Sequence, residues 1–551
     1  MEAIYKEYVK EEFDDKDVLT KIDFHYPENF NFAFDVLDEV ARRTPDALAM
    51  MWCDESGAER RFTFREMSEL SSRAANVFHD LGIRKGDRVM LVLKRHYQFW
   101  YAIMGLCKIG AVAIPATHLL TTHDFTYRFN AAGVSAVVCT ADGWTIPSIL
   151  EAEAESSALK HKLLVHGKHE SFLDFDALID AASPSFKRPT GDQATANDDM
   201  MLLYFTSGTT GLPKMVGHSF TYPIAHIVTA AYWHRVERGK LHFTVAETGW
   251  GKAVWGKLYG QWFCEAGVFV FDFERFHATE ILERIQKYKI ATFCAPPTIY
   301  RFFLAEDLSQ YDLSSVHEAT IAGEALNPEV YNEIRRRTGL KVREGFGQTE
   351  TTLTVATLYG MEPKPGSMGK PSPAYKADIV DGSNKSAKPG EVGEIVLHIE
   401  DGKPCGLFGG YYHNEELTAE VCRDGLYHTG DIAWRDEDNY FWYVGRADDL
   451  IKSSGYRIGP FEVESVLMEH PAVLECGVTG APDPVRGQIV KATVVLNKGY
   501  EGTPELTKEL QNYVKTHTAS YKYPRIVEYA AELPKTISGK IRRTDLRKNN
   551  G

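Results

Sequence analysis

The chain has 551 residues, of which 44% are hydrophobic and 25% are charged, and its formal net charge at pH 7 is -14. This length exceeds what one hydrophobic core can organise, so we expect at least two domains, and the ordinary composition excludes a disordered, fibrous or repetitive chain. The acidic balance disfavours non-specific binding to nucleic acid or to anionic lipid.

The cysteines and the N-terminal segment indicate the compartment. The 8 cysteines include no C-x-x-C pair, so we interpret them as small buried thiols rather than zinc ligands or a disulfide framework. Residues 1–15 are rich in acids and resemble neither a signal peptide nor a transit peptide. The most apolar long run, 102–120, is interrupted by Lys108, Gly110 and Pro115, which favours a helix and a buried strand over a membrane span. We therefore expect a cytoplasmic protein without membrane insertion.

Helical and strand-like segments alternate through the first part of the chain. A helix is predicted over 68–81 and another over 279–288, because apolar residues recur there at helical spacing. Strands are predicted at 88–93, 291–295 and 319–322. This alternation predicts an α/β architecture with largely parallel sheets.

The pattern changes after residue 390. Short strands and Gly/Asp/Asn turns over 390–444 predict a small antiparallel or barrel-like unit. A boundary is expected near 446–449, followed by a helix over 460–470, a strand over 490–496 and a helix over 504–516. The last part of the chain therefore predicts a small α+β domain of about a hundred residues.

A loop rich in small hydroxyls follows the apolar run 200–205. Residues 204–214 contain Thr, Ser and Gly and end in Lys214. An apolar strand that opens into such a loop can surround phosphate with backbone N–H groups, and the lysine adds positive charge. A P-loop needs Ser or Thr directly after its lysine, whereas here Pro213 precedes it and Met215 follows it. The loop therefore predicts a nucleoside triphosphate site that differs from that of P-loop kinases and GTPases.

Four further motifs follow in order, at residues 344–350, 427–431, 445–457 and 534–540. Together with the loop they resemble the adenylate-forming enzymes, which include acyl-CoA synthetases, beetle luciferases and peptide-synthetase adenylation domains. Within that group, residues 453–464 and 521–525 are most similar to medium-chain acyl-CoA synthetases. A single motif can arise by chance, but five in the same order cannot reasonably do so.

The resemblance implies a fold and a reaction. The fold is α/β, with a large N-terminal domain, residues 1–447, built from two α/β subdomains and a small β-barrel. A small mobile α+β domain, residues 448–551, follows a hinge at Asp448. In the reaction a carboxylate attacks the α-phosphate of ATP to give acyl-AMP and pyrophosphate, and the thiol of CoA then displaces AMP. ATP and CoA are thus co-substrates, Mg²⁺ is the cofactor, and the domain rotates between the two halves.

The resemblance also assigns residues. Lys540 would neutralise charge between the carboxylate and the α-phosphate, Glu350 and Thr206 would hold Mg²⁺, and Asp431 and Arg446 would bind the ribose. The catalytic set is Lys540, Thr206 and Glu350. The set for ATP and AMP is Thr206, Ser207, Gly208, Thr209, Thr210, Gly211, Lys214, Gly323, Glu324, Ala325, Glu344, Gly345, Phe346, Gly347, Gln348, Thr349, Asp431, Arg446 and Arg457.

Considered one at a time, these residues can be explained by ordinary structural roles. Glu350 would be a carboxylate at a helix start, Asp431 a turn residue, and Lys540 one lysine of a basic tail. Only their positions within the ordered motifs favour the functional assignment. In the adenine slot, glycines such as Gly323 and Gly345 would permit close approach, and the ring of Phe346 would stack on the base.

Two smaller groups complete the expected site. The positions that match CoA contacts in medium-chain relatives are Ser454, Gly455, Tyr456, Arg486 and Arg525, and guanidinium groups suit phosphate, although an exposed arginine is most often simply solvated.

The expected acyl pocket consists of Trp250, Lys252, Trp255 and Gly347. Gly347 stands where acetyl-CoA synthetases carry a tryptophan that closes the acyl pocket, so an acid larger than acetate should fit. Trp255 or Trp250 would shorten the opened tunnel, unless both are ordinary core residues. Lys252 would pair with a carboxylate or be solvated. We therefore expect a short-to-medium acid that is either aliphatic, with a straight or branched chain, or small and aromatic.

Other classes of protein compete with this interpretation. An amino-acid or aryl-acid adenylating enzyme would exchange pyrophosphate without turning over CoA. A luciferase-like oxygenase would consume O₂, and a non-catalytic nucleotide-binding regulator would bind ATP without reaction. The expected partners are a small carboxylic acid, ATP and CoA, with no nucleic acid, and a homo-oligomer is left open.

Overall fold

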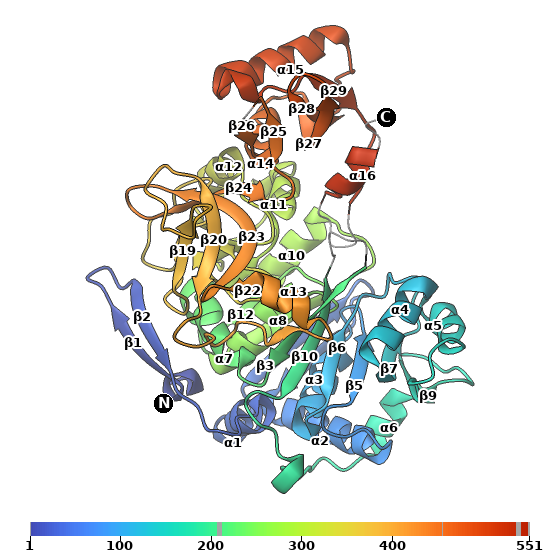
Figure 1. Ribbon diagram of the computed structural model, residues 1–551. Coiled ribbons are helices and arrows are strands. Elements are labelled where there is room, and N and C mark those ends of the chain that lie inside the picture. Colours follow the sequence, from blue (N-terminus) through green and yellow to red (C-terminus); the bar gives the residue numbers. More distant parts are fainter. Residues whose placement is uncertain (1, 207–211, 455, 536–540, 549–551) are drawn as a thin grey trace.

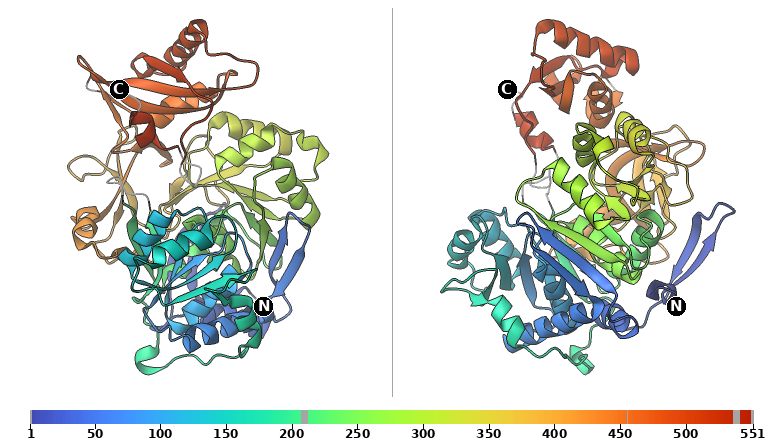
Figure 2. Two further views of the ribbon diagram at one scale, coloured as in Figure 1. Left: turned by 90° about the vertical axis from the view of Figure 1, so that its right-hand side faces the viewer. Right: turned by 180° about the vertical axis from the view of Figure 1, so that it is seen from behind.

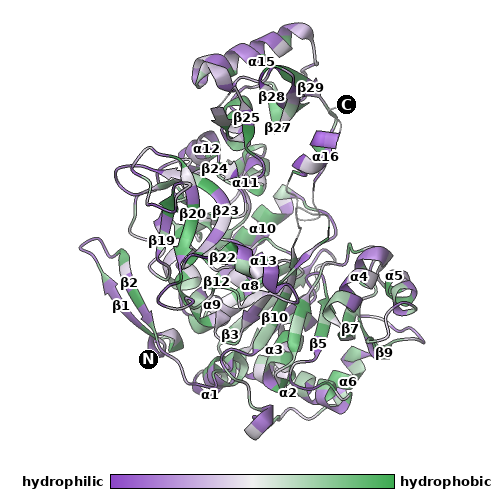
Figure 3. Ribbon diagram, in the orientation of Figure 1, coloured by the Kyte–Doolittle hydropathy of each residue, from purple (hydrophilic) through white to green (hydrophobic). Residues whose placement is uncertain are grey.

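The computed structural model describes residues 2–206, 212–454, 456–535 and 541–548, and Arg457 by its backbone alone. Within these residues the strands form one two-stranded hairpin and four larger sheets (Figure 1). Figure 3 shows the hydrophobic residues gathered in the central strands and the hydrophilic ones on the outer helices and loops. No helix in the described ranges is long and apolar enough to span a membrane.

The first large sheet is mainly parallel. Its order is β21 (Gly410–Tyr411), β11 (Lys214–Ser219), β10 (Met200–Thr206), β6 (Val112–Pro115), β5 (Arg88–Val92), β7 (Val134–Thr140), β8 (His161–Val165) and β9 (Leu173–Asp174). The helix predicted over 68–81 is α2 (Phe64–Asp80), and a capping box between Thr63 and Glu66 stabilises its start. The strand predicted after it is β5, so both predictions are confirmed.

The apolar run 102–120 belongs to the same sheet. It forms the end of α3 (Gln98–Ile109) and then β6, as a helix followed by a buried strand. Lys108 is 1% exposed, and its Nζ lies 2.8 Å from Asp38 Oδ1, so the charge inside this apolar run is paired within the core.

The second large sheet lies beside the first. Its order is β18 (Lys370–Pro371), β17 (Val355–Ala356), β16 (Val342–Phe346), β15 (Glu318–Ile321), β14 (Thr292–Cys294), β12 (Leu241–Thr244), β13 (Gly267–Asp272), β3 (Leu48–Asp54) and β4 (Glu59–Thr63). Its central strands are parallel, and α10 (Ala278–Tyr288), α11 (Pro297–Leu304) and α12 (Pro328–Thr338) connect them. The predicted helix 279–288 and strands 291–295 and 319–322 correspond to α10, β14 and β15.

The segment 390–444 is antiparallel, as predicted. Its sheet contains β19 (Ala377–Val380), β20 (Gly393–His398), β23 (Leu426–Arg435), β22 (Cys422–Arg423) and β24 (Phe441–Arg446). Ile379, Ile395 and Phe441 give it a small core of its own.

The last part of the chain has a separate sheet and a separate core. The sheet contains β26 (Tyr456–Ile458), β25 (Ile451–Ser453), β28 (Gly487–Leu496), β27 (Val473–Asp483) and β29 (Ile526–Tyr529). Helices α14 (Pro460–Met468) and α15 (Pro504–His517) cover it, close to the predicted bounds. Figures 1 and 2 show this region at one end of the molecule. It contacts the second sheet's helical layer where Asn327 Nδ2 donates to the Ser465 carbonyl at 3.1 Å.

Among the elements that were not predicted from the sequence are a hairpin at the N-terminus and a long strand in the last sheet. The acid-rich N-terminal segment forms the hairpin β1 (Val9–Phe13) and β2 (Leu19–Phe24), which projects from the body (Figure 1). Strand β27 was also missed. Of the 8 cysteines, six are buried and two are half-buried, and all are free thiols.

Candidate functional site

The phosphate loop expected at 204–214 connects two paired strands. Thr206 ends β10 and lies opposite Lys214, the first residue of β11. Lys214 Nζ stands 5.2 Å from the centre of the Tyr411 ring, and the Tyr411 hydroxyl donates to Glu350 Oε1 at 2.8 Å. Tyr411 therefore links the lysine and the carboxylate expected at the phosphates. Residues 207–211, which hold Ser207, Gly208, Thr209, Thr210 and Gly211, lie outside the described residues.

Asp431 is the centre of a buried polar cluster. It lies opposite Arg446 on the neighbouring strand β24, and Arg446 Nη1 is 3.2 Å from Asp431 Oδ2. The Tyr443 hydroxyl donates to Oδ1 at 3.0 Å and Gln348 Nε2 donates to Oδ2 at 2.5 Å. Burial raises the pKa of Asp431 even though Arg446 opposes this shift. The structure thus brings Gln348, Asp431 and Arg446, which belong to three separate motifs, together at one carboxylate.

The adenine-slot residues meet at the end of β16. Glu344 Oε2 accepts a hydrogen bond from the Leu326 N–H at 3.2 Å, which ties β16 to the loop that carries Gly323, Glu324 and Ala325. Burial raises the pKa of Glu344 to about 8. Gly323 has a φ of 101°, which favours glycine.

Gly345 is glycine for a reason other than nucleotide approach. A Cβ there would lie 2.6 Å from the Trp233 ring, so the close packing of that indole requires glycine. Phe346 lies in the same strand, with its ring 6.3 Å from that of Tyr443.

The donor set is suited to a hard cation bound together with phosphates. Among the described residues, no group of three or more His, Cys, Asp or Glu side chains is arranged to hold a metal ion alone. Glu350 offers a half-buried carboxylate and Thr206 a half-buried hydroxyl. Mg²⁺ is commonly held by one or two carboxylates plus substrate phosphates, so these residues fit that ion.

Gly347 and Trp255 are in direct contact. A Cβ at Gly347 would meet the tip of the indole, Trp255 Cη2, at 2.4 Å and the Thr352 carbonyl oxygen at 2.3 Å. Trp255 is 7% exposed and lies in α8 (Gly251–Lys257). The indole therefore fills the space beside Gly347 that a side chain at 347 would otherwise occupy.

The other two acyl-pocket candidates lie at the start of α8. Trp250 is its N-cap residue and is half-buried. Lys252 Nζ donates to the Ala322 carbonyl at 2.7 Å, directly before Gly323. This contact joins the segment expected to bind the acid to the loop expected to bind adenine.

Of the residues expected to bind CoA, Tyr456 lies in β26, and Ser454, Arg486 and Arg525 lie directly next to strands of the last sheet. Ser454 N–H donates to the Arg486 carbonyl at 3.0 Å. The exposed ring of Tyr456 stacks on that of Tyr521 at 4.0 Å with 15° between the planes, and Arg525 lies over the ring of Tyr523.

Two other residues of the expected site, Asp448 and Thr349, each make a contact with a neighbouring side chain. Asp448 Oδ1 lies 3.6 Å from Arg446 Nε, so the expected hinge begins at the Asp431 cluster. Thr349 accepts a bond from the ring of the buried His218 at 2.7 Å through its carbonyl oxygen. Gly455, Lys540 and the side chain of Arg457 lie outside what the structure describes.

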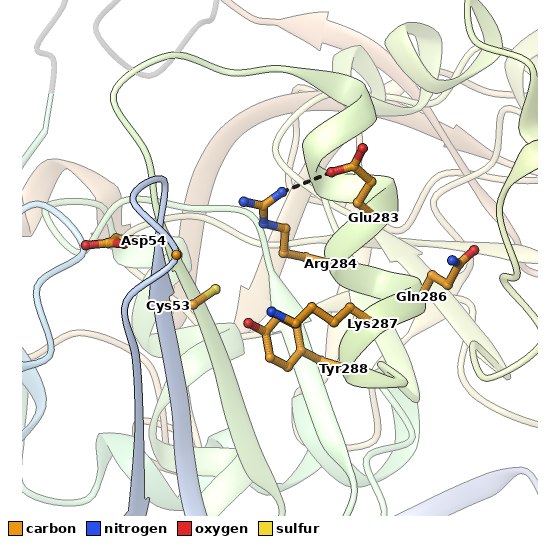
Figure 4. Close-up of a pocket in the computed structure, with 8 residues that line it drawn as sticks. Cys53, Asp54, Glu283, Arg284, Gln286, Lys287 and Tyr288 are labelled. Atoms are coloured by element: carbon orange, nitrogen blue, oxygen red, sulfur yellow. Dashed lines mark hydrogen bonds and ion pairs between the residues drawn. The ribbon is translucent and has the colours of Figure 1, made fainter.

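A groove of about 390 Å³ lies away from these residues, between the end of β3 and α10 (Figure 4). Cys53, Arg284, Lys287 and Tyr288 are among its lining residues, and Arg284 forms an ion pair with Glu283 at 3.2 Å. None of the residues expected at the site lines it, so its size does not make it the reaction centre.

Comparison with protein families gives two matches. Residues 37–412 match the AMP-binding enzyme family, and residues 462–540 match the AMP-binding enzyme C-terminal domain. Among similar proteins, acyl-coenzyme A synthetase ACSM3, mitochondrial, of Mus musculus is 40% identical and covers 100% of this chain and 96% of its own length. Acyl-coenzyme A synthetase ACSM5, mitochondrial, of Homo sapiens is 42% identical over 95% of this chain and 90% of its own.

Solved structures agree with this similarity. The anthranilate CoA ligase AuaEII, in complex with anthranoyl-AMP, superposes with a TM-score of 0.86 at 29% identity, over 95% of this chain and 98% of that one. A benzoate CoA ligase from Burkholderia xenovorans LB400 gives 0.82 at 26% identity, over 94% and 100%.

Proposed function

We propose that this chain, which belongs to the AMP-binding enzyme family, is an ATP-dependent acyl-CoA synthetase that proceeds through an acyl-AMP intermediate. The relatives named acyl-coenzyme A synthetases are 40% to 42% identical to it over nearly their whole length. The observation that supports the proposal best is the convergence of Gln348, Asp431 and Arg446, because a buried carboxylate with this support suits a ribose diol.

The first half-reaction joins two anions. A carboxylate oxygen attacks the α-phosphorus, the bond to the β-phosphate breaks, and pyrophosphate leaves. In our proposal the loop from Thr206 to Lys214 holds the outer phosphates and Lys540 neutralises charge at the α-phosphate. Glu350 and Thr206 would hold Mg²⁺, which when bound would neutralise phosphate charge. Tyr411 keeps Glu350 oriented through its hydroxyl.

The second half-reaction transfers the acyl group to CoA. The thiol sulfur bonds to the acyl carbon, the carbon–oxygen bond to AMP breaks, and AMP leaves. We assign CoA contacts to Ser454, Gly455, Tyr456, Arg486 and Arg525. The exposed ring stack of Tyr456 and the guanidinium groups support this assignment, since they offer a flat surface and phosphate ligands.

The proposal divides the chain into a body and a domain that rotates relative to it. Residues 1–447 would form the body and residues 448–551 the rotating domain, with the hinge at Asp448. The separate core of the last sheet and the two separate family matches support this division. Rotation would exchange Lys540 for the CoA face between the half-reactions.

The proposed acid is short to medium in length and is either aliphatic, with a straight or branched chain, or small and aromatic. The contact between Trp255 and Gly347 supports a pocket that ends at the indole and is shorter than an open tunnel. Two similar solved proteins are named for anthranilate and benzoate, so small aromatic acids belong in the test.

The proposed compartment is the cytoplasm, whereas the named relatives are mitochondrial. Cell fractionation decides between the two locations. Light scattering of the purified protein tests whether the chain forms a homo-oligomer.

Acid-dependent pyrophosphate release, measured with and without CoA across an acid series, tests the activity. We expect release to depend on the acid and multiple turnover to require CoA. Turnover with amino acids and no dependence on CoA would instead favour a stand-alone adenylating enzyme.

A further inference from the structure

A histidine–carboxylate pair lies at the carboxyl edge of the first sheet, outside every motif of the sequence. His118 Nδ1 is 3.3 Å from Glu247 Oε1, and the Thr117 hydroxyl donates to Glu247 Oε2 at 3.1 Å. The backbone N–H of His118 also points at Glu247 Oε1, at 3.4 Å. Glu247 is buried and the His118 side chain is 14% exposed, so the imidazole is held firmly but remains reachable.

The strand register places this pair beside the phosphate site. In the parallel pairing of β10 with β6, Leu202 lies opposite Ala113. The carboxyl ends of β10, at Thr206, and of β6, at Pro115, therefore lie at the same edge of the sheet, and Thr117 follows β6 by two residues. His118 directly follows Thr117, at the same edge as the hydroxyl that we assign to the phosphates and Mg²⁺.

The acyl segment reaches the pair from the other side. Glu247 precedes Trp250 and Trp255 in the segment that we assign to the acid. A Cβ at Gly249 would lie 2.4 Å from the Thr117 backbone nitrogen, so only glycine allows the segment to lie this close to β6. The pair therefore stands where the expected phosphate and acyl sites meet, which is where the acyl carbon of acyl-AMP would lie.

The carboxylate determines what the imidazole can do. When Nδ1–H donates to Glu247, Nε2 is left as a proton acceptor. Within the described part of the chain Nε2 has no hydrogen-bond partner. The cations that act on Glu247 are Arg95, which follows β5, and Lys257 in α8. Burial lowers the pKa of Lys257 well below its usual range, and its Nζ donates to the Ala246 carbonyl at 2.6 Å.

We infer that His118 is the general base of the second half-reaction, with Glu247 as its positioning residue. The inference rests on the proposed acyl-CoA synthesis. The thiol proton of CoA moves to His118 Nε2 as the sulfur bonds to the acyl carbon. The carbon–oxygen bond to AMP then breaks, and AMP leaves with the electron pair. A thiol is a weak nucleophile until it loses its proton, so a base at this position accelerates the transfer.

The test measures the two half-reactions separately in the full-length protein. The variant His118→Asn keeps a short amide that can still donate to Glu247 but removes the base. Acid-dependent pyrophosphate exchange should stay within about twofold of the native rate. Single-turnover transfer from preformed acyl-AMP to CoA should slow by about 10²-fold or more at neutral pH. The deficit should shrink toward high pH, where the thiol ionises without help.

A second variant covers the case in which His118→Asn does not fold. His118→Ala should show the same selective loss, and added imidazole should restore part of the transfer rate. His79→Asn, at a half-exposed histidine of the surface, is the matched control and should leave both half-reactions unchanged. An equal loss in both half-reactions, no loss in either, or a deficit that stays constant with pH would overturn the inference. Failure of the native protein to transfer acyl groups to CoA would refute the proposed function itself, and is a different result.

Discussion

Replacement of Trp255 by alanine tests whether this indole ends the acyl pocket. Trp255 is 7% exposed and its ring tip occupies the space beside Gly347, as the 2.4 Å approach to a Cβ at 347 indicates. If the indole closes the pocket, its removal should open a tunnel behind Gly347. The preferred acid should then become longer.

The size of the shift follows from the area that the indole covers. An indole occupies the room of several methylene groups, and each buried methylene contributes about 0.8 kcal/mol. Room for about four more methylenes therefore corresponds to about 3 kcal/mol, or roughly 200-fold in the ratio of kcat/KM between a long and a short straight-chain acid. The measurement is the CoA-dependent formation of AMP across a straight-chain series for both proteins.

A control separates pocket length from general damage. Loss of a buried tryptophan costs about 3–5 kcal/mol of stability wherever it occurs. The control is Trp262→Ala, which removes a fully buried indole whose Nε1 donates to the Ala49 carbonyl. Trp262 is not among the close neighbours described for Gly347. This variant should lower Tm without moving the chain-length optimum. If Trp255→Ala lowers Tm to a similar extent but leaves the chain-length optimum in place, the pocket argument is wrong.

Three further predictions concern carboxylates. Asp431→Asn should raise the KM for ATP about 10- to 100-fold in steady-state assays. The reason is that a charge-assisted hydrogen bond is worth about 1.5–3 kcal/mol and the amide offers only one acceptor oxygen. An unchanged KM would show that Asp431 does not bind the ribose. Glu350→Gln should raise several-fold the Mg²⁺ concentration needed for half-maximal pyrophosphate release, while an unchanged Mg²⁺ titration would refute its assignment. Burial raises the pKa of Glu344 from 4.5 to about 8, so the native state holds a proton that the unfolded chain releases. The contribution of Glu344 to the free energy of unfolding should therefore fall as pH rises from about 4.5 to about 8 and then stay level. In denaturant titrations, Glu344→Gln should flatten this fall. Parallel curves of unfolding free energy against pH for the two proteins would contradict the burial argument.

Periodic segments could be predicted from the sequence, and charged ones could not. The helix near 68–81 was found because Met67, Phe78 and their neighbours recur at helical spacing, and these side chains are buried in α2. The hairpin of β1 and β2 was missed because its apolar residues Val9, Phe13, Leu19, Ile22 and Phe24 do not alternate strictly with polar ones, so no regular strand period marks it. The hairpin also contacts the body of the protein, where the Tyr232 hydroxyl donates to Glu11.

Motif residues of the site could be predicted, whereas their supporting partners could not. Glu350, Asp431 and Gln348 lie within short local patterns. Tyr411 joins Glu350 only because β21 pairs with β11, and His118 meets Glu247 across 129 residues of chain. Tertiary structure alone creates such contacts, so a single sequence carries no local signal for them.

The most direct test of the account follows oxygen from the acid to the nucleotide. The purified protein is incubated with ATP, CoA and an accepted acid whose two carboxylate oxygens are labelled with ¹⁸O, and the products are examined by mass spectrometry. Attack of the carboxylate on the α-phosphorus predicts one labelled oxygen in AMP, one in the acyl group of acyl-CoA, and none in pyrophosphate. Label in inorganic phosphate with ADP as product, or unlabelled AMP, would contradict the acyl-AMP route.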